Sequence, residues 1–309
     1  MNNDTFLALV AKKYYIDKIK QNEIARFFKV STMMVSRLLK EAETRGIVTF
    51  HVKTPWQMDA ELGREIIEKY GLLDCYVFDL QDNEELPMKL GFLLADYFCQ
   101  ILPKKNVIVG LSWGYTISKF VEALPYIKVD NLSLVQLTGS FPYNGFTDTP
   151  TEMLNRMSKK MDGKIYFLHA PLYVATEQIK NNLLNDPLNF TIEHLAAKAD
   201  INIIGASELS LTSNTLKSGT IGKNDFNELV KLKSIGDLAG TFLDKNGIPI
   251  QWSKSVLNTG VGLEQIRKAK NVICVAGEKR KLGIIRKTCE KKYYNTLFTT
   301  KHIAEGLLK

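Results

Sequence analysis

Four short segments of the sequence combine glycine with polar residues directly after apolar runs that are typical of buried strands. They are residues 110–116, 138–140, 235–240 and 277–281. Glycine lets a ligand approach the backbone closely, and backbone N–H groups at the start of a helix attract an anion. Asp237 can accept hydrogen bonds from ligand hydroxyls, and Lys281 adds positive charge. Each segment alone is weak evidence because such turns are common, but together they indicate a pocket for a small phosphorylated or polyhydroxylated ligand.

A second group of polar residues follows Ser31 in the segment QNEIARFFKVSTMMVSRLLKEAETRG. If this segment folds as two helices, the outward face of the second is predicted to reach base edges in a DNA major groove. That face carries Thr32, Met33, Ser36, Arg37 and Lys40. Arg37 suits guanine or a phosphate, whereas Met33 suits a thymine methyl group or, equally well, local packing together with Met34. Three cations are better placed for phosphates than for bases: Lys29, Lys40 and Arg45.

The spacing of apolar residues predicts helices over residues 4–15, 21–28 and 31–44, with Ser31 as the N-cap of the third. Gly46 is placed to end that helix in a left-handed conformation, and residues 47–52 alternate as a strand. These elements form a helix-turn-helix with a β wing. Lys29 holds the turn position where glycine is usual, and a positive φ there costs a lysine roughly 1 kcal/mol. A plain three-helix packing module is the alternative.

Length and charge divide the chain into two parts. A chain of 309 residues favours two domains, and we place the boundary so that residues 1–55 form a DNA-binding domain and residues 56–309 a ligand-binding and oligomerisation domain. Residues 1–55 carry a net charge of +5 out of +8 for the whole chain, which fits a polyanionic partner. Contents of 45% hydrophobic and 24% charged residues exclude a disordered chain and a polytopic membrane protein.

From residue 56 onward, apolar runs alternate with amphipathic segments, which predicts a doubly wound α/β domain with a mostly parallel sheet. The expected strands are residues 72–78, 107–111, 132–137, 165–169, 201–204, 272–276 and 297–300. The expected helices lie near residues 59–70, 87–101, 115–124, 150–160, 174–183, 223–233, 262–269, 278–290 and 301–308. Ligands bind such sheets at the carboxyl ends of the strands, where the four glycine-containing segments are expected to lie.

The four cysteines, Cys75, Cys99, Cys274 and Cys289, form no C-x-x-C pair and have no histidine at metal-ligand spacing. We therefore expect reduced thiols and no metal or cofactor. The N-terminal segment MNNDTFLALVAKKYY is neither a signal peptide nor a spanning helix, so the protein is expected to be cytoplasmic and to have no membrane partner.

Several stretches together resemble the SorC (sugar-binding, DeoR-like) family of bacterial transcriptional regulators over nearly the whole chain. They are QNEIARFFKVSTMMVSRLLKEAETRGIV, GLSWGYTISKFVEAL, HAPLYV, SIGDLAGTFLDKNGIPI, GLEQIRKAKNVICVAGEKRK and LFTTKHIAEGLL. The resemblance implies a winged helix-turn-helix joined to an effector domain related to sugar-phosphate isomerases and deaminases. It also implies a dimer or tetramer, a palindromic double-stranded DNA operator, and a sugar effector that is often phosphorylated.

Carried over position by position, the resemblance implies an effector pocket made of Gly110, Ser112, Gly114, Thr116, Gly139, Ser140, Asp237 and Lys281. Backbone amides and Lys281 would meet the phosphate, and Asp237 would meet hydroxyls. The sequence departs from the family at Tyr115, where arginine is frequent, at Glu278, where a second glycine is common, and at Thr300, where aspartate is common. Because two of these changes disfavour an anion, an unphosphorylated sugar or polyol remains an alternative effector.

Three function classes follow. The first is a ligand-controlled transcriptional regulator of an operon for carbohydrate use, and it is not an enzyme. The second is a sugar-phosphate isomerase or deaminase with an attached DNA-binding domain, which needs a positioned base such as Asp237, Glu264 or His169. The third is a constitutive DNA-binding protein whose α/β domain serves only for assembly. No recognisable catalytic set unites the candidate bases, so we expect the first.

Overall fold

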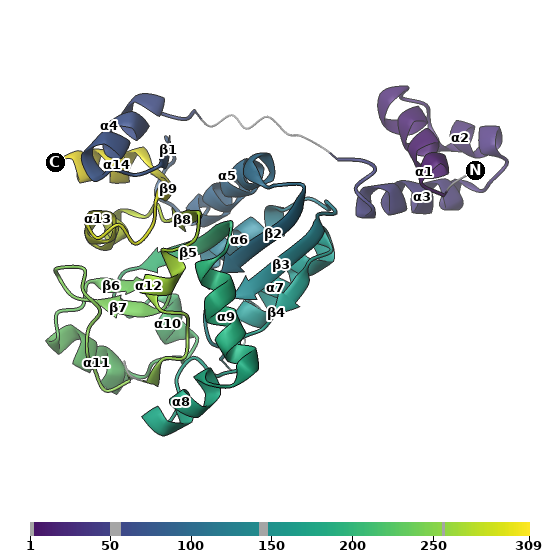
Figure 1. Ribbon diagram of the computed structural model, residues 1–309. Helices are drawn as coiled ribbons and strands as arrows, with labels where there is room; N and C mark the ends of the chain where they lie inside the picture. Colours follow the sequence, from purple (N-terminus) through teal and green to yellow (C-terminus); the bar gives the residue numbers. More distant parts are fainter. Residues whose placement is uncertain (1–2, 50–56, 142–147, 255–256) are drawn as a thin grey trace.

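The computed structural model describes residues 3–49, 57–141, 148–254 and 257–309. Three helices with a core of their own stand beside a larger α/β domain (Figure 1). The helices are α1 (Asn3–Ala11), α2 (Gln21–Phe28) and α3 (Thr32–Thr44), and a π-helical turn over Lys12–Ile16 continues α1. We call residues 3–49 the three-helix module and residues 57–309 the α/β domain. The predicted boundary near residue 56 lies outside the described residues.

The three-helix module contains the predicted helix-turn-helix. Its core joins Leu7 and Val10 of α1 to Ile24 of α2 and to Val35 and Leu39 of α3, all of them buried. Ser31 caps α3 as predicted, because its Oγ accepts a hydrogen bond from the N–H of Met34 at 3.1 Å. The long amphipathic pattern of the sequence is therefore accounted for by one small, local core.

Helices α2 and α3 end in the same way, with one left-handed residue that turns the chain back on itself. Lys29 has a φ of 55°, and Gly46 has a φ of 68°. In each case the N–H of the following residue returns to a carbonyl near the helix end: Val30 to Ala25 at 3.0 Å, and Ile47 to Ala42 at 2.9 Å. This is the Schellman arrangement, and it confirms the positive φ predicted at both positions.

The wing strand predicted for residues 47–52 is wrong over its described part. Residues 47–49 form no strand, and residues 50–52 lie outside the described residues. The N–H groups of Ile47 and Val48 both donate to the carbonyl of Ala42. The side chains of Ile47 and Val48 pack against the core of the three-helix module. These apolar residues therefore close helix α3 rather than begin a sheet.

The α/β domain confirms the doubly wound, mostly parallel sheet. In its described residues the sheet has nine strands, seven of them in the order β1-β9-β8-β5-β2-β3-β4, and all six pairings along this order are parallel. The strands are β1 (Asp74–Phe78), β2 (Lys105–Leu111), β3 (Asp130–Gln136), β4 (Lys164–Tyr166), β5 (Ile201–Ser207), β8 (Asn271–Val275) and β9 (Thr296–Thr300). The central strands are buried on both faces, which explains their nearly continuous apolar sequence.

Helices cover both faces of the sheet. One core joins the sheet to α5 (Leu86–Ile101), α6 (Tyr115–Ala123) and α7 (Pro150–Met161). The core on the opposite face joins it to α4 (Ala60–Tyr70), α9 (Pro187–Ala197), α12 (Leu263–Ile266), α13 (Leu282–Glu290) and α14 (Lys301–Leu308). Along β2, Val107 and Val109 face the first core and Ile108 the second, as a period of two requires. Helix α9 was not predicted from the sequence.

An antiparallel hairpin extends the sheet beyond β5. Strand β6 (Gly236–Leu238) pairs with β5 and with β7 (Thr241–Leu243). Ala239 and Gly240 form the two-residue turn, with φ values of 50° and 83°, which is the pattern of a type I′ hairpin. From the sequence, residues 235–240 were predicted only as a turn, because a three-residue strand that contains Gly and Asp gives no strand signal.

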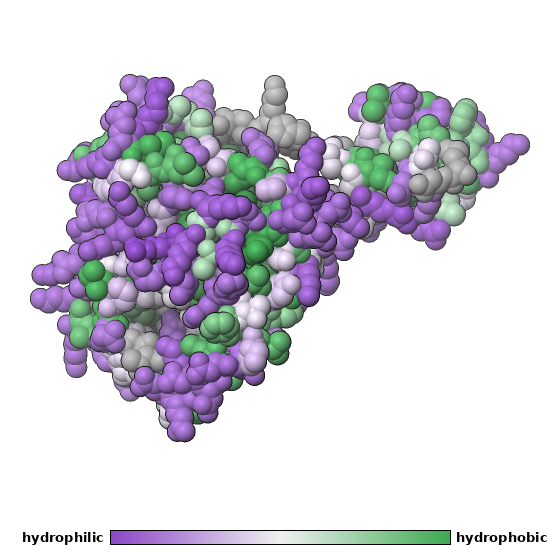
Figure 2. Space-filling view, viewed as in Figure 1, coloured by the Kyte–Doolittle hydropathy of each residue, from purple (hydrophilic) through white to green (hydrophobic). Residues whose placement is uncertain are grey.

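The α/β domain contains three further helices: α8 (Glu177–Leu184), α10 (Asn214–Lys217) and α11 (Lys223–Lys231). Hydrophilic side chains cover most of the face in Figure 2, and hydrophobic side chains gather there only in limited areas. Among the described residues, no helix is both long and apolar enough to cross a membrane.

Candidate functional site

Helix α3 presents the five predicted DNA-contact residues on one exposed face. Its opposite face packs Val35, Leu38, Leu39 and Ala42 into the core of the three-helix module. Thr32, Met33, Ser36, Arg37 and Lys40 are all exposed. Positions 33, 36, 37 and 40 repeat at helical spacing, so their side chains form one stripe along α3. The geometry thus leaves this stripe free to enter a groove.

The structure distinguishes local packing from a base contact for Met33 and Met34, and it shows which of the predicted phosphate contacts are exposed. Met34 is half-buried and packs against the core, whereas 83% of Met33 is exposed. Local packing therefore explains Met34 but not Met33. Among the predicted phosphate contacts, Lys29 and Lys40 are exposed. Arg45 is instead engaged with Asp4 at 3.0 Å and with Glu41 at 2.5 Å, which reduces the positive charge it offers.

A cavity of the α/β domain lies at the carboxyl ends of β2, β5 and β8. The chain runs outward through β2, β3 and β4 and then returns to pair β5 with the other side of β2. This reversal of strand order leaves a crevice where the loops after β2 and β5 diverge, the usual ligand position in such folds. The cavity there has a volume of about 900 Å³, enough for a sugar-sized ligand.

Four of the eight predicted effector residues line this cavity: Gly114, Thr116, Asp237 and Lys281. Gly114 and Thr116 stand at the start of α6, Asp237 lies on β6, and Lys281 ends a 3₁₀ turn after β8. Tyr115, one of the departures from the family pattern, also lines the cavity. Three predicted loops therefore meet in one place.

The other four predicted residues are not among the described lining residues. Gly110 packs against Asn202, and Ser112 is buried with its N–H bonded to the carbonyl of Ile203. Gly139 packs so closely on Leu172 that a Cβ would lie 2.5 Å from its Cα. The Oγ of Ser140 accepts a hydrogen bond from Gln136 at 3.1 Å. Glycine in these segments therefore serves close packing of strands and loops.

Asp237 is the buried carboxylate of the cavity. The hairpin turn places the N–H of Gly240 at 3.0 Å from its Oδ2, which fixes the side chain. Only 8% of Asp237 is exposed. Burial raises the pKa of Asp237 to about 6, and nearby Glu208 adds to the rise, whereas the Gly240 N–H and Lys281 oppose it. Asp237 is thus placed to accept hydrogen bonds from ligand hydroxyls and is sensitive to mildly acidic pH.

Lys281 is buried and paired with Glu278. Its Nζ lies 2.7 Å from Oε2 of Glu278, and the two side chains are 11% and 12% exposed. Burial acts to raise the pKa of Glu278, but Lys281 and then Arg280 outweigh it and leave that pKa below its ordinary value. Thr300, a further departure, donates through Oγ1 to the carbonyl of Gly277 at 2.8 Å and holds the start of this segment.

The lining residues that come from the segment after β5 were not predicted from the sequence. They are Ser207, Thr212, Ser213, Thr215 and Lys217. The signal was present as a run of serine and threonine, ASELSLTSNT, directly after a buried strand. Trp113 and Asp148 also line the cavity, and the indole N–H of Trp113 donates to the carbonyl of Asp148 at 2.7 Å. Uncharged hydroxyl groups therefore make up much of one wall.

The three candidate catalytic bases do not come together. Asp237 lies in the cavity, but His169 and Glu264 are not among the described lining residues. His169 is exposed, and its backbone N–H donates to Oδ1 of Asn189 at 3.0 Å. Glu264 is paired with Arg267 at 2.8 Å on α12. The three predicted bases therefore do not form a catalytic set of the kind that sugar isomerisation requires.

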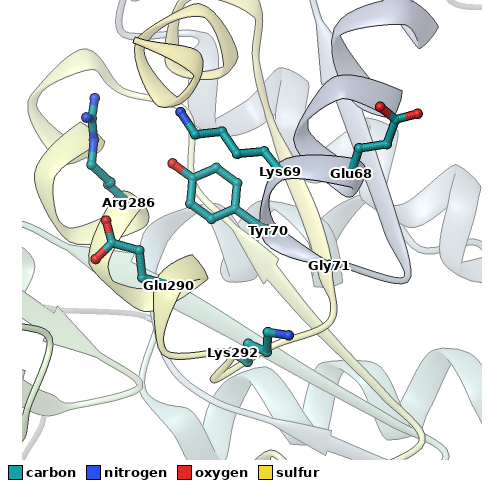
Figure 3. A pocket seen from close by; sticks show the side chains of 7 residues that line it. All are labelled: Glu68, Lys69, Tyr70, Gly71, Arg286, Glu290 and Lys292. Atoms are coloured by element: carbon teal, nitrogen blue, oxygen red, sulfur yellow. The ribbon is translucent and has the colours of Figure 1, made fainter.

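A second hollow, of about 570 Å³, lies between α4 and α13. Figure 3 shows Lys69 and Tyr70 of α4 across from Arg286 and Glu290 of α13. Lys69 donates to the carbonyls of Leu307 and Leu308 at 2.8 and 3.0 Å, and Tyr70 donates to Leu307 at 2.9 Å. These donors satisfy the free carbonyls at the end of α14, so this hollow has a structural role.

Comparisons with known proteins agree with this geometry. Residues 55–309 match the family model described as "Putative sugar-binding domain". The chain is 26% identical over 300 residues to the deoxyribonucleoside regulator of Bacillus subtilis strain 168, covering 96% of this chain and 95% of that protein. It is 24% identical over 315 residues to the sorbitol operon regulator of Klebsiella pneumoniae, covering 97% and 96%.

A solved structure extends the likeness to the whole fold. The crystal structure of the full-length sorbitol operon regulator SorC from Klebsiella pneumoniae aligns with a TM-score of 0.74 and 22% identity, covering 99% of this chain and 98% of that one. Fold and site together define a sugar-binding domain joined to a helix-turn-helix module. The chain belongs to the SorC/DeoR family of sugar-binding transcriptional regulators. Both of these curated relatives are named as regulators.

Proposed function

We propose that the protein regulates transcription of an operon for carbohydrate use by binding operator DNA in response to a sugar, a polyol or a sugar phosphate. The cavity at the carboxyl ends of β2, β5 and β8 binds the effector, and the exposed stripe of α3 reads base edges. The observation that carries the proposal is this cavity, which lies where the strand order reverses in a domain of a sugar-binding family. Relatives named for deoxyribonucleosides, erythritol and sorbitol support a sugar or polyol as the effector.

In this proposal the active form is a homodimer or homotetramer on a palindromic operator. Two-fold symmetry of the protein would be matched by two-fold symmetry of the DNA, with one α3 in each half-site. The effector binds one arrangement of the oligomer more tightly than another, which changes the spacing of the three-helix modules and hence the operator affinity. Positive charge of the chain segment 1–55, a net +5, supports the phosphate contacts.

The test is selection of bound sequences from a random pool of duplex DNA, followed by operator titrations with and without candidate sugars. We expect enrichment of a palindrome and at least a ten-fold change in operator affinity with one sugar. The full chain is used, and its mass on the operator gives the oligomeric state. Recovery of no common sequence would contradict the proposal.

The two rival functions give different results in the same samples. A constitutive DNA-binding protein would enrich a palindrome but show no sugar-dependent shift of thermal stability. An isomerase or deaminase would convert a sugar phosphate, which the separation of Asp237, His169 and Glu264 does not support. Direct product detection after incubation with sugar phosphates distinguishes the enzyme from the regulator.

A further inference from the structure

The cavity floor near the end of β8 contains the cations that an anionic ligand would need. Arg280 and Lys281 belong to the 3₁₀ turn Lys279–Lys281, and both line the cavity. Lys281 is buried, whereas Arg280 is about half exposed, at 53%. A third lining cation, Lys217, is exposed. Among the described lining residues, only Lys281 is therefore a buried positive charge.

The protein's own carboxylates already pair with the two cations of this turn that line the cavity, Arg280 and Lys281. Glu278 holds Lys281 at 2.7 Å, and its other oxygen lies 3.7 Å from Arg280. Arg280 is also 3.1 Å from Oε1 of Glu208. Buried ion pairs with both partners desolvated are hard to separate, because either charge left alone is strongly disfavoured. An incoming phosphate would therefore compete with Glu278 for the charge of Lys281.

Three carboxylates lie near these two cations. Asp237 and Glu278 line the cavity, whereas Glu208 is not among the described lining residues but pairs with Arg280, and all three carboxylate side chains are largely buried. Neither oxygen of Glu208 accepts a hydrogen bond from the described residues, so its charge is offset only by the nearby Arg280. A ligand that carries two more negative charges would meet a site that is already negative.

The remaining lining groups fit an uncharged ligand. Asp237 can accept hydrogen bonds, and Ser207, Thr212, Ser213 and Thr215 can donate or accept them. Hydroxyl groups of a sugar need this mixture of donors and acceptors. We propose that Glu278 is an internal anion that takes the place of a phosphate, so that the effector is a sugar or polyol without a phosphate group. This inference rests on the proposed function, because it specifies the ligand class of the same cavity.

The first test uses inorganic phosphate as the probe and does not depend on the identity of the sugar. Calorimetric titration of phosphate into the full-length protein is compared with the Glu278→Gln variant, which keeps the size of the side chain but frees Lys281. We expect no binding to the wild type at millimolar phosphate and at least a ten-fold gain in affinity in the variant. Phosphate binding by the wild type in the micromolar range, or no gain in the variant, would overturn the proposal.

Two control variants separate the charge of Glu278 from a general loss of structure. Glu278→Asp keeps the negative charge and should not gain phosphate binding. Glu264→Gln breaks an exposed ion pair with Arg267 on α12, and it too should show no gain. If Glu278→Gln does not fold, Glu208→Gln removes the second carboxylate that faces Arg280, and it is expected to gain phosphate affinity instead. Gain in the Glu264→Gln control would overturn the assignment to this site.

The second test compares matched ligands: 2-deoxyribose, erythritol and sorbitol, each with and without a phosphate ester. Thermal shifts of the wild type should favour the free member of a pair, and Glu278→Gln should reverse that order. Preference of the wild type for the phosphorylated member would overturn this inference while leaving the proposed function intact. An operator affinity that no sugar changes contradicts the proposed function, and the phosphate titration still decides the role of Glu278.

Discussion

Gly110 on β2 lies directly against the side-chain amide of Asn202 on β5: a Cβ at residue 110 would lie 2.1 Å from Oδ1 of Asn202. The Nδ2 of Asn202 donates to the carbonyls of Ala196 and Ile266, both at 2.9 Å. One buried amide thereby joins helices α9 and α12 to the central strand. The absence of a side chain at Gly110 makes room for this link.

Substitution of Gly110 by alanine is therefore expected to destabilise the α/β domain. Asn202 cannot move away without breaking two buried hydrogen bonds, so we expect a loss of about 1–3 kcal/mol in the free energy of unfolding. Denaturant unfolding of Gly110→Ala measures it. Gly283→Ala on α13 is the matched control, because a Cβ there meets nothing within 4 Å. Equal stability of Gly110→Ala and the wild type would contradict this packing role.

Replacement of Lys29 by glycine should stabilise the three-helix module. Lys29 has a φ of 55°, which glycine adopts without the steric cost that a Cβ brings. We expect a gain of about 1 kcal/mol for Lys29→Gly, measured by thermal unfolding. Lys29→Ala removes the same charge but keeps the Cβ, so it should give no gain. A similar gain in both variants would mean that charge, and not backbone strain, limits stability at this turn.

Arg37 is predicted to read operator sequence. Its side chain is exposed on the stripe of α3, where a bidentate contact to guanine discriminates against the wrong base by about 1–3 kcal/mol. Arg37→Ala should therefore narrow the difference in affinity between operator and random duplex, measured at fixed salt. Arg64→Ala, an exposed arginine on α4 outside the module, should leave it unchanged. Unaltered discrimination by Arg37→Ala would leave Arg37 at most a phosphate contact.

Asp237 is expected to make stability depend on pH between about 4 and 6. Its pKa is raised from 3.8 to about 6 by burial, so the folded protein binds a proton in this window that the unfolded chain has released. Stability conferred by the neutral carboxyl is thus lost as pH rises from about 4 to 6. Over this range the free energy of unfolding of Asp237→Asn should rise by up to about 3 kcal/mol relative to that of the wild type. Above pH 6 this difference should stay constant.

Unfolding midpoints measured at intervals from pH 4 to 7.5 give this comparison. Asp244→Asn serves as the contrast, because hydrogen bonds from Ile248 and Asn246 lower the pKa of Asp244 below 3.8. The stability that Asp244 confers is present above about pH 4 and is lost only at more acidic values. Parallel curves for Asp237→Asn and the wild type would show that Asp237 titrates normally.

Features that depend on residues close together in the sequence could be predicted. The cap at Ser31, the left-handed residues at Lys29 and Gly46, and the mostly parallel pairing of the sheet follow from local spacing and residue type. The wing was predicted wrongly over residues 47–49, because Ile47 and Val48 have the alternation of a strand but pack back onto the core of the three-helix module. A pattern of period two does not reveal which core its apolar side chains will join.

The cavity could be predicted only in part for the same reason. Gly110 and Gly114 are four residues apart and equally suited to a ligand, yet only Gly114 lines the cavity. The choice depends on the side chains of neighbouring strands, such as Asn202, which are far away in sequence. The polar segment after β5 was missed because its place at the cavity depends on β5 pairing with β2 and β8.

The pairing of the first strand with the last has a consequence for synthesis of the protein on the ribosome. Asp74 of β1 pairs with Thr296 of β9, which is translated about 220 residues later. At roughly 5–20 residues per second, the edge of the sheet waits tens of seconds for its partner, whereas the three-helix module needs only nearby contacts. Each new chain is therefore expected to have a folded helix-turn-helix before its sensor is complete, so a chaperone that binds the nascent chain would be expected to contact the unfinished sheet and not the N-terminal helices.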